Sequence, residues 1–166
     1  MGCDEPLAGI DVDGPVLVEV FVLYVRTGAI ELTGPCGAAP WYIEKAAGEH
    51  PVDVVHRLVV DAIGEPELVH STSWRQSDDG VILSFFVVVG PALVEAMDSA
   101  PVGRSPLARS GATTAPATIA TGQVLEHAIR HLAWLARDDE AVQAKLSEEW
   151  RSALAPYLPE PFRNLG

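Results

Sequence analysis

The feature that most constrains this chain is an apolar run near its start, Pro15 to Arg26, which reads PVLVEVFVLYVR. Most of its residues are β-branched or aromatic, as in a strand that is buried on both faces of a sheet. The run is shorter than the roughly 20 residues that a membrane-spanning helix needs, and it contains Glu19. We therefore expect a sheet built around one long central strand.

Turn residues divide the sequence around this run into further strands. Thr27-Gly28 leads into Ala29 to Thr33, which predicts a hairpin, and Trp41 to Glu44 predicts a short strand. A second hairpin is expected from Glu67 to Gln76 and Val81 to Val89, because turn-forming residues separate these two runs.

Other segments have the helical period. Apolar residues recur every three or four positions between His50-Pro51 and Gly64, where glycine is expected just after the helix ends. Gln123 to Arg137 has the same period, and Asp138-Asp139 is expected to begin another helix that runs to about Leu154. Residues 99–122, rich in small residues and proline, predict a long loop.

This order of elements predicts an α+β fold, in which helices pack against a mixed or antiparallel sheet. The length of 166 residues fits one domain. We expect residues 1–14 to form an acidic leader and residues 15–166 a single domain, with the loop at 99–122 and a pair of C-terminal helices within residues 123–155.

Charge and cysteine content limit the partners and the compartment. The chain has 23 acidic and 11 basic residues, a net charge of -12, which disfavours nucleic acids and anionic membranes as partners. Cys3 and Cys36 are too few for a disulfide scaffold. The first 14 residues contain no basic residue, unlike a signal peptide. These observations predict a cytoplasmic protein.

The segment Glu49 to Glu65 resembles the Nudix box of the Nudix hydrolases. That signature reads Gly, five residues, Glu, seven residues, then Arg-Glu-apolar-any-Glu-Glu-any-Gly-apolar. Here seven residues separate the first glutamate from Arg57, and Val59 and Gly64 keep the register. Asp61 stands in for one metal-binding glutamate. The order of strands around the helix is also similar, so the resemblance implies a Nudix-like fold.

Three positions of the box depart from the family pattern. Leu58 replaces the glutamate after arginine, Ala62 replaces the second glutamate of the pair, and Ile43 stands where the family has its first glycine. Hydrolysis of a pyrophosphate needs divalent cations, and Mg²⁺ prefers several oxygen ligands. Two apolar residues in place of carboxylates therefore predict that a conventional magnesium site is missing.

The preferred hypothesis is a Nudix-like domain that has lost metal-dependent pyrophosphohydrolase activity and binds a small, nucleotide-like molecule. In the alternative, the protein is a divergent pyrophosphohydrolase for nucleoside diphosphate derivatives, with Mg²⁺ or Mn²⁺ held by displaced ligands. Glu49 and Asp61 are then the catalytic and metal-binding candidates together with Glu44, and Glu65 or Glu67 just past the helix is a further candidate. In a third hypothesis the protein is structural and forms a homodimer through its C-terminal helices.

The residues kept from the box also have simpler interpretations. Arg57 lies four residues from both Asp53 and Asp61, a spacing that predicts a solvent-exposed ladder of ion pairs on the helix. Glu49 is placed to cap the start of the helix. Gly64 is expected to take the left-handed conformation common after helices.

Further candidates lie outside the box. Trp41, Trp74 and Arg75 flank it in the sequence and, with Arg57, are the candidates for lining a ligand pocket in which a planar molecule stacks. His127 and His131 have the i, i+4 spacing that can chelate a metal ion, although half-buried or surface histidines are the simpler expectation.

Overall fold

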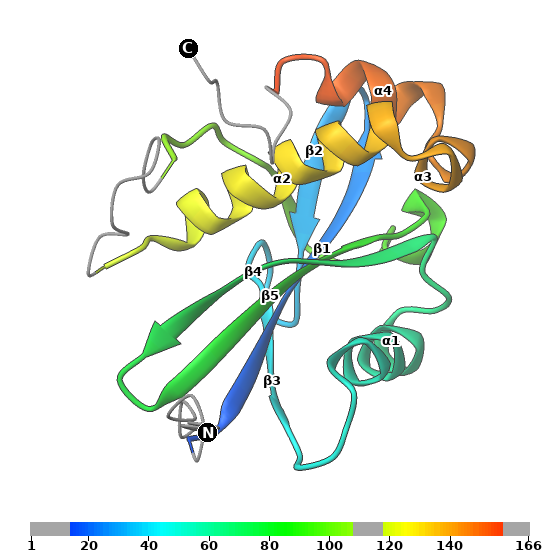
Figure 1. Ribbon diagram of the computed structural model, residues 1–166. Helices are drawn as coiled ribbons and strands as arrows, with labels where there is room; N and C mark the ends of the chain where they lie inside the picture. Colours follow the sequence, from blue (N-terminus) through cyan, green and yellow to red (C-terminus); the bar gives the residue numbers. More distant parts are fainter. Residues whose placement is uncertain (1–13, 108–117, 158–166) are drawn as a thin grey trace, which may run out of the picture.

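The computed structural model describes residues 14–107 and 118–157, which form an α+β fold around a mixed six-stranded sheet (Figure 1). The strands lie in the order β4-β5-β1-β2-β6, and β3 pairs with β1. Their bounds are β1 Val16–Arg26, β2 Ala29–Thr33, β3 Trp41–Lys45, β4 Leu68–Ser77, β5 Gly80–Val88 and β6 Ser99–Pro101.

The apolar run at the start of the chain is the central strand, as predicted. β5 pairs with β1 in parallel along one edge, from Val16↔Val81 to Leu23↔Val88. Two short antiparallel strands share the other edge, where β3 pairs with the first half of β1 and β2 with the second half. Because both edges are hydrogen-bonded and both faces are covered, eight consecutive residues of β1 are buried.

Helices cover both faces of the sheet (Figure 1). α1 (Pro51–Ala62) packs on the face of β1 that carries Val18 and Val20. The opposite face carries Phe21 and Leu23 and is covered by three helices, α2 (Thr121–Asp138), α3 (Glu140–Lys145) and α4 (Glu148–Leu154). Side chains of a strand alternate between its faces, so β1 contributes to both cores. None of the helices described is long and apolar enough to cross a membrane.

The structure corrects two predictions about the second half of the chain. Ser99–Pro101 is not loop but strand β6, which pairs with β2. The expected last helix is two helices, because Leu146 is extended and Ser147 caps α4 by accepting a hydrogen bond from the Trp150 amide. Residues 108–117 of the predicted loop and the predicted acidic leader, apart from Gly14, lie outside the described residues.

The end of α1 is as predicted. Gly64 has a φ of 137°, and its amide donates to the carbonyl of Val59. A Cβ at this position would lie 3.1 Å from a methyl carbon of Leu93 in the short 3-10 helix η1 (Pro91–Leu93), so glycine is favoured by both backbone and packing.

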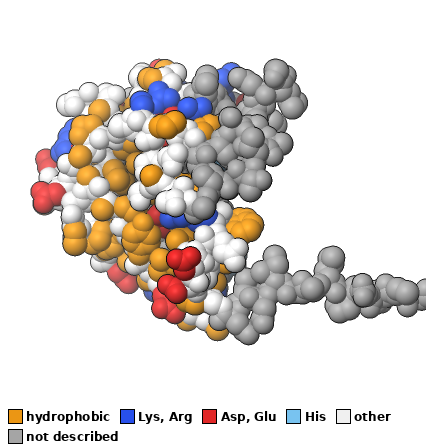
Figure 2. Space-filling model, turned by 90° about the vertical axis from the view of Figure 1, so that its left-hand side faces the viewer, with side chains coloured by type: hydrophobic (Ala, Val, Ile, Leu, Met, Phe, Trp, Pro, Cys, Tyr) orange, Lys and Arg blue, Asp and Glu red, His pale blue; other side chains and the backbone are white. Residues whose placement is uncertain are grey.

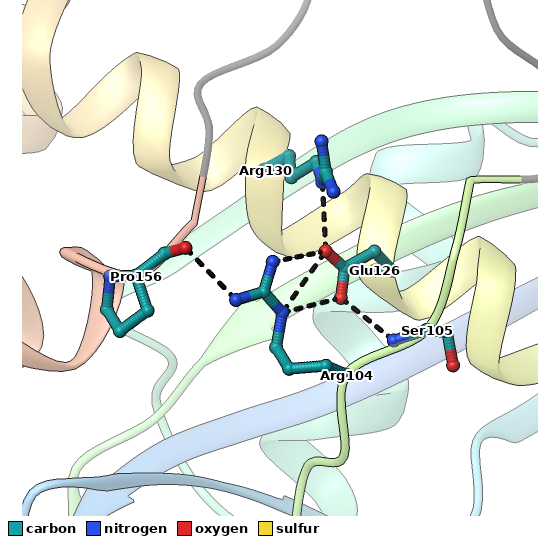
Figure 3. A network of polar contacts seen from close by, with 5 residues as sticks. All are labelled: Arg104, Ser105, Glu126, Arg130 and Pro156. Atoms are coloured by element: carbon teal, nitrogen blue, oxygen red, sulfur yellow. Dashed lines mark hydrogen bonds and ion pairs between the residues drawn. The ribbon is translucent and has the colours of Figure 1, made fainter.

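A buried carboxylate links α2 to the segment after β6 and to the end of α4 (Figure 3). Glu126 is fully buried and accepts hydrogen bonds from Arg104 Nη2 at 2.9 Å and Arg130 Nε at 2.9 Å. The amide of Ser105 is a further donor, and Arg104 also donates to the carbonyl of Pro156. Burial acts to raise the pKa of Glu126, but these donors outweigh it and hold the pKa below its usual value.

We expect Glu126→Ala to destabilise the protein strongly, because it leaves Arg130, only 15% exposed, without its carboxylate. Removing one partner of a buried ion pair costs about 3–5 kcal/mol, and the loss here should fall at the low end because Arg104 is 47% exposed. Urea unfolding measures the change. Glu148→Ala is the matched control, since its pair with Arg151 is exposed and should contribute under about 0.5 kcal/mol. If Glu126→Ala and Glu148→Ala lower the free energy of unfolding equally, Glu126 is not the stabilising buried carboxylate described above.

Candidate functional site

A groove of about 370 Å³ lies between the start of α1 and the outer hairpin of the sheet. We call it the β4 groove, and its lining residues are His50, Pro51, Val52, Ser71, Thr72, Ser73, Trp74, Leu83 and Phe85. Leu83 and Phe85 come from β5 and face the α1 side, while the polar residues come from β4 and the helix start. The groove therefore combines apolar surface with hydroxyl groups and one imidazole.

A β-bulge in β4 gives the groove its tryptophan. The pairing with β5 shifts between Ser71 and Ser73, so Thr72 is an extra residue in the strand. Without the shift, Trp74 would lie on the same face as His70, which contacts α2. The extra residue places Trp74 on the α1 side instead, where it lines the groove and is 67% exposed.

His50 has a defined role at the rim of the groove. Its Nδ1 accepts a hydrogen bond of 3.3 Å from the amide of Val52 and so caps α1. In the neutral ring the proton is then on Nε2, which makes this atom a hydrogen-bond donor. The cap was predicted for Glu49, and the structure corrects that prediction.

The same bulge sends Arg75 to the opposite face of the sheet, where it joins what we call the Glu19 cluster: Glu19, Tyr42, Arg75 and Ser84. Glu19 is fully buried in β1, and Arg75 donates to both of its carboxylate oxygens, at 2.8 and 2.9 Å. Tyr42 from β3 and Ser84 from β5 donate to Glu19 at 2.7 and 2.8 Å. Four donated hydrogen bonds satisfy the buried carboxylate.

Tyr42 is the half-exposed member of this cluster. Burial raises the pKa of its phenol to about 12, and the hydrogen bond to Glu19 and the charge of Glu19 act in the same direction. Thr121, at the start of α2, and Arg75 act against this rise.

The structure pairs the box residues differently from the predicted ladder. Arg57 Nη2 lies 2.7 Å from Glu49 Oε1, and in the described part of the chain Arg57 makes no ion pair or hydrogen bond with Asp53 or Asp61. Glu49 also accepts from the amide of Ala46. Hydrogen bonds from Arg57 and Ala46 lower the pKa of Glu49. The arginine therefore ties the loop before α1 to the helix.

The carboxylates proposed as displaced metal ligands are not brought together. Among residues 14–107 and 118–157, no three His, Cys, Asp or Glu side chains are grouped so that they could hold a metal ion. Glu65 pairs with His56 at 3.0 Å, and Asp61 is exposed on α1. Leu58, which stands where the family has a glutamate, packs against the core on the α1 side, whereas Ala62 is exposed.

Of the four predicted pocket residues, only Trp74 lines the β4 groove. Trp41 packs against the core under α1, and its indole N–H is buried without a hydrogen-bond partner among the described residues. Arg57 and Arg75 are engaged by Glu49 and Glu19. Sequence reasoning missed Glu19 as a site residue, although a carboxylate inside an apolar run is itself a signal that a buried partner exists.

The charged side chains do not form a basic surface on the face shown in Figure 2. Among the described residues of that face, acidic and basic groups are scattered between hydrophobic and neutral ones. A second hollow, of about 380 Å³, lies where α3 and α4 meet the sheet and is lined in part by Glu67, Lys145 and Glu149. It carries charged groups of both signs, whereas none of the described residues that line the β4 groove is Asp, Glu, Lys or Arg.

We expect Tyr42 to ionise near pH 12. The unfolded chain loses the same proton near pH 10. The protonated phenol of Tyr42 therefore contributes fully to the stability of the fold below pH 10, and its contribution is lost as the pH rises through the folded-state pKa. Ultraviolet difference spectra of the wild type and Tyr42→Phe should isolate this ionisation. Glu19→Gln should move it to lower pH, and a Tyr42 ionisation near pH 10 in the wild type would refute the assignment.

Comparison of the sequence with protein-family models finds no match, and a search of curated proteins finds none either. The resemblance to the Nudix box stays a prediction that rests on the register of Glu49, Arg57, Val59, Asp61 and Gly64.

Proposed function

We propose that this chain binds a small, planar, uncharged heterocycle of the nucleoside type in the β4 groove. The observation that carries the proposal is Trp74, a large aromatic side chain that is 67% exposed beside apolar groove residues. Single aromatic rings in such positions stack on flat ligands, and a base stacked on an aromatic side chain gains about 1–3 kcal/mol.

The size and polarity of the groove support a ligand of this kind. Its volume of about 370 Å³ lies at the lower end of the range for small-molecule sites. Leu83 and Phe85 give the groove an apolar wall, while His50 Nε2 and the hydroxyl of Ser71, which pairs with Phe85, suit the polar edge of a heterocycle.

Charge favours a nucleoside over a nucleotide. The described residues that line the groove include no lysine or arginine that would neutralise a phosphate. The first turn of α1, beside the groove, carries Asp53, which opposes an anion there. The net charge of -12 adds a general repulsion of phosphates.

We also propose that the Nudix-like domain has lost metal-dependent pyrophosphohydrolase activity. Leu58 packs against the core, where the family glutamate would serve a metal ion. Glu49 is occupied by Arg57 and by a backbone amide. The cytoplasm is the proposed compartment, since Cys36 is a free, exposed thiol of the kind found in reducing surroundings.

Calorimetric titration of adenosine and of AMP tests the proposed ligand class. We expect adenosine to bind at least about tenfold more tightly than AMP, a difference of about 1.4 kcal/mol. Trp74→Ala should weaken adenosine binding about 5- to 150-fold because the stacking surface is lost. Trp74→Phe should retain most of the affinity.

The control variant is Leu93→Ala, which removes another exposed hydrophobic side chain, in η1 outside the groove, and should bind adenosine like the wild type. The proposal fails if adenosine does not bind below about 1 mM, or if Trp74→Ala and the wild type bind it equally.

The loss of hydrolase chemistry is tested by titrating MgCl₂ and MnCl₂ into the wild type, Asp61→Ala and Asp53→Ala. We expect the three titrations to agree, because neither exposed aspartate has neighbouring carboxylates grouped with it as metal ligands in the described residues. Saturable heat that disappears in Asp61→Ala alone would support the divergent hydrolase instead.

A further inference from the structure

A pair of histidines joins β4 to α2 on the face of the sheet opposite the β4 groove. His70 lies before the bulge in β4, and His131 lies in the middle of α2. Their Nε2 atoms are 3.0 Å apart, and the ring centroids are 5.0 Å apart. Both side chains are partly buried. We call these two residues the histidine pair.

The pair is assembled across two elements rather than along one helix. His127, one turn before His131 on α2, has its ring centroid 6.4 Å from that of His131, wider than the separation within the pair. Phe86 and Trp134 contact the pair from β5 and α2, with ring centroids 5.5 Å from His70 and 5.4 Å from His131. Aromatic side chains thus hold both rings in place.

The contact between the two imidazoles requires at least one unprotonated ring nitrogen, because one Nε2 atom must accept the hydrogen bond that the other donates. The pKa of His131 is lowered to about 4, mainly by burial and in addition by the neighbouring His70 and His127. Burial also lowers the pKa of His70, although the carboxylate of Asp139 acts against this. A neutral imidazole has a free nitrogen lone pair, which is the form that binds a metal ion.

The spacing of the two nitrogens is close to that of a metal site. Zn–N bonds of about 2.0–2.1 Å at a tetrahedral angle place two ligand nitrogens about 3.3 Å apart. The observed 3.0 Å needs an outward movement of only about 0.3 Å to reach this spacing. The negative field of Asp139 at His70 and the acidic chain as a whole favour a cation.

We propose that His70 and His131 form a two-histidine site for a zinc ion that clips the edge strand β4 to α2. Each ring binds the ion through Nε2 and keeps its proton on Nδ1. The one proton shared between the two Nε2 atoms moves to Nδ1 of its own ring through solvent, so binding releases no net proton. Water fills the remaining coordination positions. Imidazole nitrogen is one of the usual protein ligands of zinc.

Calorimetric titration of ZnCl₂ into the metal-free full chain tests this site, with ¹⁵N spectra of the histidine rings as a second readout. We expect one saturable site, weakened at least about tenfold in both His70→Asn and His131→Asn, because each variant removes one of two protein ligands. In the wild type, zinc should convert both rings to the Nδ1–H form. Thermal unfolding without zinc verifies that each variant is folded.

His127→Ala is the decisive comparison, because it distinguishes a site across two elements from an ordinary i, i+4 pair on a helix. The proposal is supported if His127→Ala binds zinc within about threefold of the wild-type affinity while His70→Asn loses zinc binding. If instead His127→Ala loses zinc binding and His70→Asn retains it, the ion lies on α2 alone and the proposal is overturned. The absence of saturable zinc binding below about 1 mM would overturn it as well. His56→Ala, on α1, is the control for general loss of a histidine.

Discussion

A negative charge in the middle of the central strand constrains the rest of the sheet. Glu19 is fully buried, with β3 on one side of its strand and β5 on the other. An unpaired carboxylate there would be prohibitively costly, so the fold needs a cation at that point. Arg75 supplies it with two hydrogen bonds, and because Arg75 belongs to β4, the ion pair joins the edge strand to the central strand across β5.

The bulge in β4 connects this ion pair to the proposed ligand site. Side chains alternate along a strand, so an extra residue exchanges the faces of everything beyond it. With Thr72 inserted, Arg75 lies on the α2 face beside Glu19, and Trp74 lies on the α1 face in the groove. Removing the extra residue would exchange these two positions, which would leave Glu19 without its cation and the groove without its aromatic wall.

The sequence predicts much of the fold, since hydrophobic period and turn residues define the long strand, both hairpins and the helices that follow them. It does not predict β6, whose three residues carry no pattern and pair through their backbone with β2. The bulge cannot be predicted from the sequence either, because the run Ser71 to Ser73 contains only small hydroxyl residues and so has no apolar and polar alternation that would mark the change of face. A pairwise spacing rule likewise gave Arg57 the wrong partner, since Glu49 reaches it from the preceding loop.

The two sites proposed for this molecule share one strand and lie on its opposite faces. His70 precedes the bulge and faces α2, whereas Trp74 follows it and faces α1. As the described edge of the sheet, β4 is hydrogen-bonded to one strand only, so side-chain contacts must provide much of its attachment to the layers on either side. A zinc ion between His70 and His131 would restrain the segment just before the bulge. Because the bulge sets the face that Trp74 occupies, a restraint there favours the geometry in which the groove is formed.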